Sequence, residues 1–263
     1  MIRLAIFDID GTLYDEVRGI YCPDSADALR QLQERDIQVV VATGRPPMTI
    51  DILAKEGIYP DYFICNNGHT VLNRKREYIV NEVFEPQLAE EVYQYCLEHD
   101  IGLLWKYPES VYVYINHREF DFLSQKSKEF KSLWNYTNRK IHLSRGPSGG
   151  CLGCDIGKLA DFNDHFVNRC IGVIINSQSS DLMLYGINKK YGLVRLLELT
   201  KIKPEECIAF GDNINDLEII EYVGIGVCMG NGADALKERS DFVTTKIDDH
   251  GVLNALKHYN LLD

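Results

Sequence analysis

The stretch Asp8-Ile9-Asp10-Gly11-Thr12 decides the fold, and it follows an apolar run that begins at residue 3. Two carboxylates separated by one residue can share a metal ion or divide the roles of nucleophile and proton donor. Gly11 permits a sharp turn away from the strand. A calcium loop fits poorly, because that loop places its glycine at position six and a glutamate at position twelve. The stretch therefore indicates a functional site at the end of a first β-strand.

Two further polar motifs each follow an apolar, strand-like run. Thr43-Gly44-Arg45 comes after residues 38–42, and its hydroxyl and backbone N–H groups can hold a phosphate oxygen, with a simple turn as the alternative. Gly211-Asp212-Asn213-Ile214-Asn215-Asp216 comes after residues 207–210. For this motif the alternative is helix capping by Asn215 or Asp216, because Asp and Asn are preferred N-caps.

The runs before these motifs belong to a repeated order of strand and helix at both ends of the chain. Continuous rather than alternating apolar strands indicate a parallel sheet covered on both faces. We therefore predict an α/β fold with a Rossmann-like parallel sheet. Strands are expected over residues 3–9, 38–42, 62–65, 207–210, 225–228 and 242–244, and helices over residues 24–35, 190–199, 217–222 and 252–258.

All three motifs lie at the carboxyl ends of predicted strands, where open α/β sheets bind their ligands. This position should gather several carboxylates, and like charges in one crevice repel each other unless a cation is bound. Oxygen ligands favour a hard ion, so we expect Mg²⁺ as the cofactor. The carboxylates expected at this metal are those of Asp8, Asp10, Asp212 and Asp216.

A phosphate site also needs positive charge besides the metal. Lys189 is the candidate, because it lies where the chain returns from its middle part and starts a helix, in Gly186-Ile187-Asn188-Lys189-Lys190. A solvated surface charge is the alternative for a single lysine.

The middle of the chain has a different character. Its predicted strands carry aromatic residues, as in residues 111–115, and helices are expected over residues 87–97 and 121–131. This pattern indicates an α+β domain inserted into the first one. We expect a core domain of residues 1–82 and 185–263 and an inserted domain of residues 83–184.

The composition of the 263-residue chain excludes several functions. With 28 Lys+Arg against 39 Asp+Glu, the net charge of −11 argues against a nucleic acid or an anionic membrane as partner. No apolar run approaches the roughly 20 residues of a membrane span, so we expect a cytoplasmic protein. The eight cysteines are expected to be reduced and packed in the interior, including the Cys151 and Cys154 pair.

Taken together, the motifs resemble those of the haloacid dehalogenase superfamily of aspartate-nucleophile phosphatases, most closely its Cof-type branch. The superfamily commonly has glycine after its lysine, where this chain has Lys190, and Lys189 aligns with the usual position. The middle resembles the inserted cap of that branch in position and size. The matching stretches are, in order, Asp8 to Thr12, Thr43 to Arg45, Asn66-Asn67-Gly68, Lys189, Gly211 to Asp216 and Met229-Gly230-Asn231-Gly232.

The resemblance implies a role for each matched residue. Asp8 would be the nucleophile that forms an aspartyl-phosphate, with its carboxylate also on Mg²⁺. Asp10 would protonate the leaving alcohol and then accept a proton from water, with its backbone carbonyl on the metal, which favours ester hydrolysis over dehalogenation. The other implied roles are metal binding by Asp212, phosphate binding by Thr43, Gly44 and Lys189, orientation of phosphate, lysine or metal-bound water by Asn215 and Asp216, and substrate contact by Arg45 and Asn67.

We therefore expect a magnesium-dependent phosphatase for small phosphomonoesters such as sugar phosphates or phosphorylated cofactors, with no evident protein partner. A phosphotransferase or mutase that uses the same intermediate is the nearest alternative. A catalytically silent metabolite-binding protein is the alternative from another class.

Overall fold

The structure, a computed structural model, describes residues 1–15, 17–116, 118–120, 134–176 and 179–263. Contacts divide the chain into two units. Unit 1 comprises Met1–Arg45, Ile50–Val80 and Asn188–Asp263, and unit 2 comprises Pro46–Thr49 and Asn81–Ile187. Residues 46–49, which the sequence analysis assigned to the first domain, group with unit 2, where Met48 packs against a small apolar cluster.

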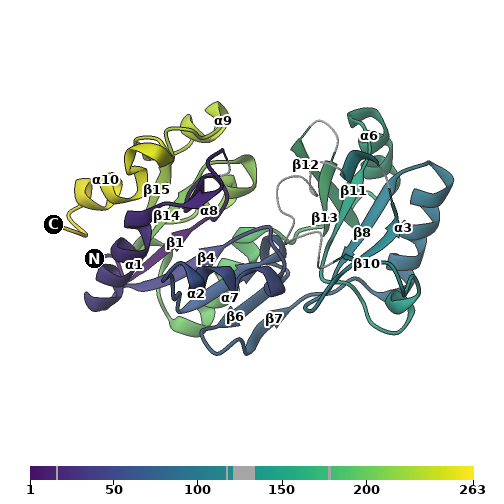
Figure 1. The fold of residues 1–263 in the computed structure, drawn as a ribbon, viewed down its shortest axis with the longest axis horizontal. Helices are drawn as coiled ribbons and strands as arrows, with labels where there is room; N and C mark the ends of the chain where they lie inside the picture. The colour runs from purple at the N-terminus through teal and green to yellow at the C-terminus, as the bar shows by residue number, and fades with distance from the viewer. Residues whose placement is uncertain (16, 117, 121–133, 177–178) are drawn as a thin grey trace. The chain divides into compact units, whose positions relative to one another are not determined.

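Unit 1 is built on an eight-stranded sheet in the order β16-β15-β14-β1-β4-β5-β6-β7 (Figure 1). Neighbouring strands from β16 to β5 pair in parallel, and β6 runs antiparallel to β5. The predicted α/β fold with a parallel sheet is thereby confirmed. The strands are β1 Leu4–Phe7, β4 Gln38–Ala42, β5 Tyr62–Cys65, β6 Thr70–Asn73, β7 Tyr78–Asn81, β14 Cys207–Gly211, β15 Ile225–Cys228 and β16 Phe242–Val243.

Both faces of this sheet are buried, which explains its continuous apolar strands. Ala5 and Phe7 of β1 face one cluster, which includes side chains of α1, α2 and α10, whereas Leu4 and Ile6 face another, which includes side chains of α7, α8 and α9. The helices are α1 Pro23–Glu34, α2 Ile52–Lys55, α7 Lys189–Thr200, α8 Leu217–Ile220, α9 Asp234–Lys237 and α10 Gly251–His258.

The order of the central strands determines where the motif loops emerge. Strand β1 lies between β4 and β14, with Phe7 in register with both Val41 and Phe210. The loops that follow these three parallel strands therefore leave the same edge of the sheet side by side. A short antiparallel hairpin, β2 Tyr14–Asp15 and β3 Ile20–Tyr21, follows the first of these loops.

Unit 2 is an α+β unit whose six-stranded sheet has the order β10-β9-β8-β11-β13-β12. Tyr112 and Tyr114 of β9 pack in a cluster with side chains of α3 and α6, whereas Val111 and Val113 pack in a smaller cluster with Leu104. The elements are α3 Pro86–Glu98, β8 Gly102–Lys106, β9 Val111–Ile115, β10 Trp134–Asn135, β11 Gly150–Gly153, α6 Ile156–His165, β12 Cys170–Asn176 and β13 Ser179–Leu184.

Two further sequence expectations can be compared with the structure, and a third cannot. The helix expected over residues 121–131 lies outside the described residues. All eight cysteines are buried, as expected. Within the described part of the chain, no helix combines the length and apolar character needed to cross a bilayer.

Candidate active site

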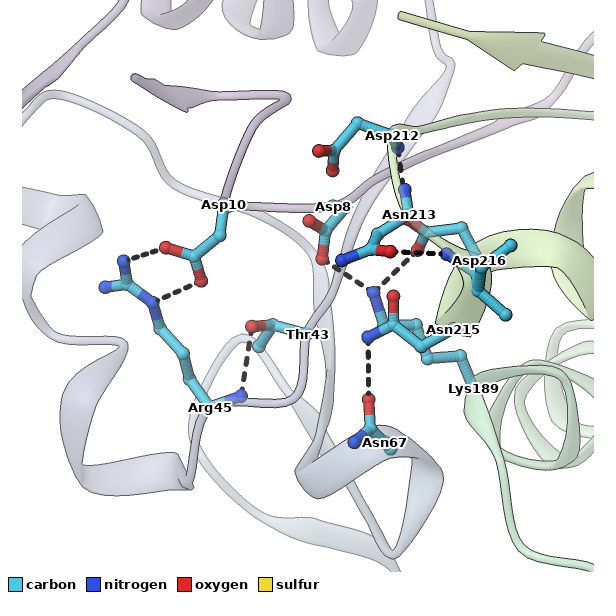
Figure 2. A network of polar contacts seen from close by, with 11 residues as sticks. Asp8, Asp10, Thr43, Arg45, Asn67, Lys189, Asp212, Asn213, Asn215 and Asp216 are labelled. Carbon is cyan, nitrogen blue, oxygen red and sulfur yellow. Dashed lines mark hydrogen bonds and ion pairs between the residues drawn. The ribbon is translucent and has the colours of Figure 1, made fainter. Parts of the chain in front are cut away.

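Asp8 lies at the carboxyl end of β1, with its backbone N–H donating to the carbonyl of Phe210. Only 6% of its surface is exposed. The Lys189 ammonium group donates to Asp8 Oδ1 at 2.7 Å and to Asp216 Oδ1 at 2.6 Å (Figure 2). The structure therefore brings together three of the predicted site residues, from β1, from the start of α7 and from the segment after β14.

Lys189 is the first residue of α7, and two contacts hold that end of the helix. The side chain of Asn188 caps the helix by accepting the N–H of Tyr191 at 2.9 Å. Gly68 packs directly against the Asn188 carbonyl, since a Cβ at Gly68 would lie 1.9 Å from that oxygen. Lys190 takes a different direction, with its ammonium 4.8 Å from the centre of the Tyr222 ring. Of the two lysines, Lys189 is the one in the carboxylate cluster.

The segment after β14 turns its carboxylates inward through a capping arrangement. Asp216 Oδ2 accepts the backbone N–H groups of Asp212 at 3.1 Å and Asn213 at 3.2 Å. Asn213 is the N-cap of the short helix Ile214–Asp216, and Asp216 completes the capping box. Of the two residues suggested as helix caps, Asp216 accepts backbone N–H groups, whereas the Asn215 amide donates to Asn67 Oδ1 at 3.2 Å.

Gly11 creates the space for the Asp212 side chain. Its φ is +83°, and a Cβ at this position would lie 2.1 Å from Asp212 Oδ2. The Asn231 amide also donates to the Gly11 carbonyl at 2.9 Å. From the sequence, Gly11 was expected to permit a sharp turn. In the structure it also leaves the space into which Asp212 of a second motif fits.

The cluster carries more negative than positive charge. Burial raises the pKa of Asp8 to about 7; the Lys189 charge opposes this shift, and the Asp216 and Asp10 charges add to it. Burial, followed by the Asp8 and Asp216 charges, raises the pKa of Asp212 to about 8. Burial alone would lower the pKa of Lys189, but the two carboxylates beside it raise that pKa overall. Without a further cation, the site therefore favours retained protons on its carboxylates.

The donor set fits a hard divalent cation. Carboxylate oxygens of Asp8, Asp212 and Asp216 lie within 4.8 Å of one another. Asp212 Oδ1 is buried and accepts no hydrogen bond from any described residue, as expected for an oxygen that acts as a metal ligand. Oxygen-only donors suit Mg²⁺ better than zinc.

The Asp10 side chain lies apart from this cluster. Its two oxygens accept hydrogen bonds from Arg45, with Nε to Oδ2 at 2.8 Å and Nη2 to Oδ1 at 2.5 Å (Figure 2). The Asp10 side chain is therefore not supported as a metal ligand. The backbone carbonyl of Asp10, which the resemblance implied as a ligand, remains the candidate. Thr43 is buried, and its Oγ1 accepts the Arg45 backbone N–H at 3.1 Å.

Besides the space that Gly11 provides for Asp212, sequence reasoning missed two features of the site. The first is the Arg45–Asp10 pair, for which no local signal exists because the residues are 35 positions apart. The second is the capping role of Asn213, and its spacing of three residues from Asp216 is the signal that could have revealed it.

Comparisons with known proteins identify the family of the chain. A family model described as haloacid dehalogenase-like hydrolase matches residues 5–256. This match confirms the resemblance drawn from the motifs and the expectation of a hydrolase.

The chain is also similar along its length to individual proteins. It is 29% identical to the HMP-PP phosphatase of Serratia proteamaculans over 98% of this chain and 94% of that protein. It is 25% identical to the 5-amino-6-(5-phospho-D-ribitylamino)uracil phosphatase YcsE of Bacillus subtilis, over 99% and 96%. The solved structure of BT1666 from Bacteroides thetaiotaomicron superimposes with a TM-score of 0.90 at 23% identity, covering 100% of this chain and 96% of that one, which shows a shared fold.

Proposed function

Because the chain belongs to the haloacid dehalogenase-like hydrolase family, we propose that it is a magnesium-dependent phosphatase that hydrolyses small phosphomonoesters through an aspartyl-phosphate on Asp8. The observation that carries the proposal is the buried Asp8 carboxylate, which shares one lysine with Asp216 in a cluster with excess negative charge. Phosphoryl transfer depends mainly on such positioning and charge neutralisation.

The residues divide the reaction into two steps. An oxygen of the Asp8 carboxylate attacks phosphorus, the bond to the ester oxygen breaks, and that oxygen takes the proton of the Asp10 carboxyl group. Water then attacks the phosphorus of the aspartyl-phosphate while Asp10 takes its proton, and the release of phosphate restores Asp8. Lys189, the Thr43 hydroxyl and the Gly44 backbone hold the phosphoryl oxygens. Asn215 also helps to bind these oxygens, and its contact with Asn67 holds its side chain in place.

Magnesium, when bound, supplies positive charge that neutralises the phosphoryl oxygens and the attacking carboxylate. The side chains of Asp8, Asp212 and Asp216 would hold it, together with the backbone carbonyl of Asp10. The relatives support a small substrate, because those named above act on small phosphorylated compounds. We therefore place the substrate among small phosphorylated metabolites, with cytoplasmic action and no macromolecular partner.

The deciding experiment measures phosphate release from sugar phosphates, nucleotides, pyridoxal phosphate and flavin mononucleotide, with and without Mg²⁺. We expect Mg²⁺-dependent release by the parent protein and a loss of at least roughly 10³-fold in Asp8→Asn, which removes the nucleophile. Asp15→Asn is the matched control, because the Asp15 side chain is also buried but accepts the backbone N–H groups of Val17 and Arg18 in the β2–β3 hairpin. Release that survives Asp8→Asn would refute the proposal, and transfer of phosphate to an added sugar instead of water would favour the phosphotransferase.

A further inference from the structure

Arg45 binds the side chain of the proposed acid and base, Asp10, and not the carboxylate cluster. The two hydrogen bonds from Nε and Nη2 use both Asp10 oxygens, so the planar guanidinium and the carboxylate face each other as a fork (Figure 2). Such bidentate, charge-assisted pairs fix orientation as well as distance. The pair therefore determines in which direction the Asp10 carboxylate points.

Arg45 is itself held at both ends. Its backbone N–H donates to Thr43 Oγ1, and its carbonyl accepts the N–H of Asn66 at 3.0 Å. At the other end, the guanidinium carbon lies 5.3 Å from the centre of the Tyr14 ring, and a quarter of the side chain is exposed. A freely moving surface arginine would not be anchored in this way, so the fork has a fixed origin in the Thr43 loop.

We propose that Arg45 is a positioning residue for Asp10: through its two hydrogen bonds it orients the carboxylate that exchanges protons with the leaving group and with water. This proposal rests on the proposed function and replaces the expectation that Arg45 contacts the substrate. Proton transfer needs the carboxylate within hydrogen-bond reach of the reacting oxygen, so an unheld Asp10 loses rate in the steps that require its proton.

The first test compares two esters of similar size that differ in their need for a proton. p-Nitrobenzyl phosphate has an alkoxide leaving group that needs protonation, whereas p-nitrophenyl phosphate has a leaving group that departs without it. We expect Arg45→Met to lower kcat/KM by about 10²-fold for the benzyl ester, within the range that acid catalysis contributes. For the phenyl ester we expect kcat and KM to fall together, because only the later hydrolysis of the aspartyl-phosphate requires Asp10.

Two variants serve as comparisons for Arg45→Met. Arg45→Lys should regain little of the loss, since an ammonium group keeps the charge but lacks the fork. Arg76→Met should leave kcat and KM unchanged for both esters, although Arg76 likewise pairs with a carboxylate, that of Asp51, and lies over an aromatic ring, that of Phe63. Equal losses of kcat/KM for both esters, or a rise in KM alone, would overturn the proposal in favour of substrate binding by Arg45.

The second test asks whether Arg45 acts through Asp10. In an Asp10→Ala background, Arg45→Met should cost little further activity, because the group that it orients is gone. Additive losses would contradict the proposal.

A crystal structure of Arg45→Met provides a readout that needs no turnover. We expect the Asp10 carboxylate to leave its present orientation; an unchanged orientation would overturn the proposal. If the parent protein hydrolyses no ester at all, the proposed function fails, and this crystal structure still decides whether Arg45 orients Asp10.

Discussion

Each unit contains a buried lysine bound to a carboxylate, and the two sites differ in the charge around that lysine. In unit 2, Lys106 pairs with Asp181 at 2.6 Å. In unit 1, Lys189 pairs at similar distances with two carboxylates, and a third, that of Asp212, lies within metal-ligand reach of both. The Lys106 contact joins one ammonium group to one carboxylate, whereas the Lys189 cluster has three carboxylates around one ammonium group.

This difference separates a structural ion pair from a site that requires a cation. A balanced buried pair satisfies its own charges, and replacing such a pair by apolar residues is often neutral. An unbalanced cluster carries a continuing electrostatic cost: burial raises the pKa values of Asp8 and Asp212, and the neighbouring carboxylates raise them further. Such a cost is typical of active sites, where a bound substrate or metal ion neutralises the excess charge. Burial of a lysine is therefore a poor sign of function unless the neighbouring charges are counted.

The largest effect expected from this comparison is on turnover. Lys189→Met removes the positive charge proposed to hold the phosphoryl group, and we expect kcat to fall by roughly 10²–10³-fold. Lys106→Met should leave the turnover of p-nitrophenyl phosphate largely intact and instead lower the free energy of unfolding by about 3–5 kcal/mol, because it removes the ammonium group that neutralises the largely buried Asp181 carboxylate. Steady-state kinetics and urea unfolding measure the two quantities.

Compensating variants sharpen this contrast. Adding Asp181→Leu to Lys106→Met should restore most of the lost stability, whereas adding Asp216→Leu to Lys189→Met should restore no activity. Lys190→Met is the control beside Lys189 and should stay within about threefold of the parent, as surface changes usually do. A larger loss for Lys190→Met than for Lys189→Met would refute the assignment of the lysine.

The site elements in unit 1 could be predicted because they depend on local sequence. Continuous apolar runs gave the strands at their observed bounds for residues 38–42, 62–65 and 225–228, and polar residues directly after strands gave the site edge. The family and the hydrolase class, predicted from the order of the motifs, are confirmed.

What could not be predicted depends on contacts between distant residues. The direction of the Asp10 side chain is set by Arg45, and the room for Asp212 by Gly11, and neither contact follows from any periodicity. The charge environment of Lys106 was equally hidden, because Asp181 lies 75 residues further along the chain. Local pattern thus predicts which residues reach the site, and tertiary packing decides how they point.

A medium effect is expected on metal affinity, from two glycines with nearly the same backbone. Gly11 in unit 1 has φ +83° and adjoins Asp212. Gly186 in unit 2 has φ +80°, and among the described residues no atom beyond its two chain neighbours lies within 4 Å of its Cβ position. Both changes to alanine should cost about 1–2 kcal/mol of stability through left-handed strain. Only Gly11→Ala should also displace the Asp212 carboxylate and weaken Mg²⁺ binding by about 10–100-fold, the range seen when a metal ligand loses its support. Titration calorimetry with Mg²⁺ tests this, and equal affinity for the two variants would contradict it.

The smallest effect concerns stability against pH in the absence of metal. Asp8 and Asp212 have folded-state pKa values of about 7 and 8, above the ordinary value near 4. Between pH 4 and the folded-state pKa values, the folded protein keeps protons on these two carboxyl groups that the unfolded chain has lost. The contribution of the two groups to stability is therefore full below about pH 4 and is lost as the pH rises through 7 and 8. We expect the Tm measured in EDTA to fall from pH 5.5 to pH 9, by about 2–4 °C for each kcal/mol lost.

Added Mg²⁺ should reverse this decline, because the cation takes the place of the retained protons on ionised carboxylates. The stabilisation by Mg²⁺ should therefore grow with pH across the same interval. Asp212→Asn removes one of the two carboxyl groups whose pKa is raised. The Tm of this variant in EDTA should therefore fall less steeply with pH and respond less to Mg²⁺. A Tm in EDTA that rises from pH 5.5 to pH 9 would show that the cluster is balanced after all, as the Lys106 pair is, and would remove the electrostatic reason for a metal at this site.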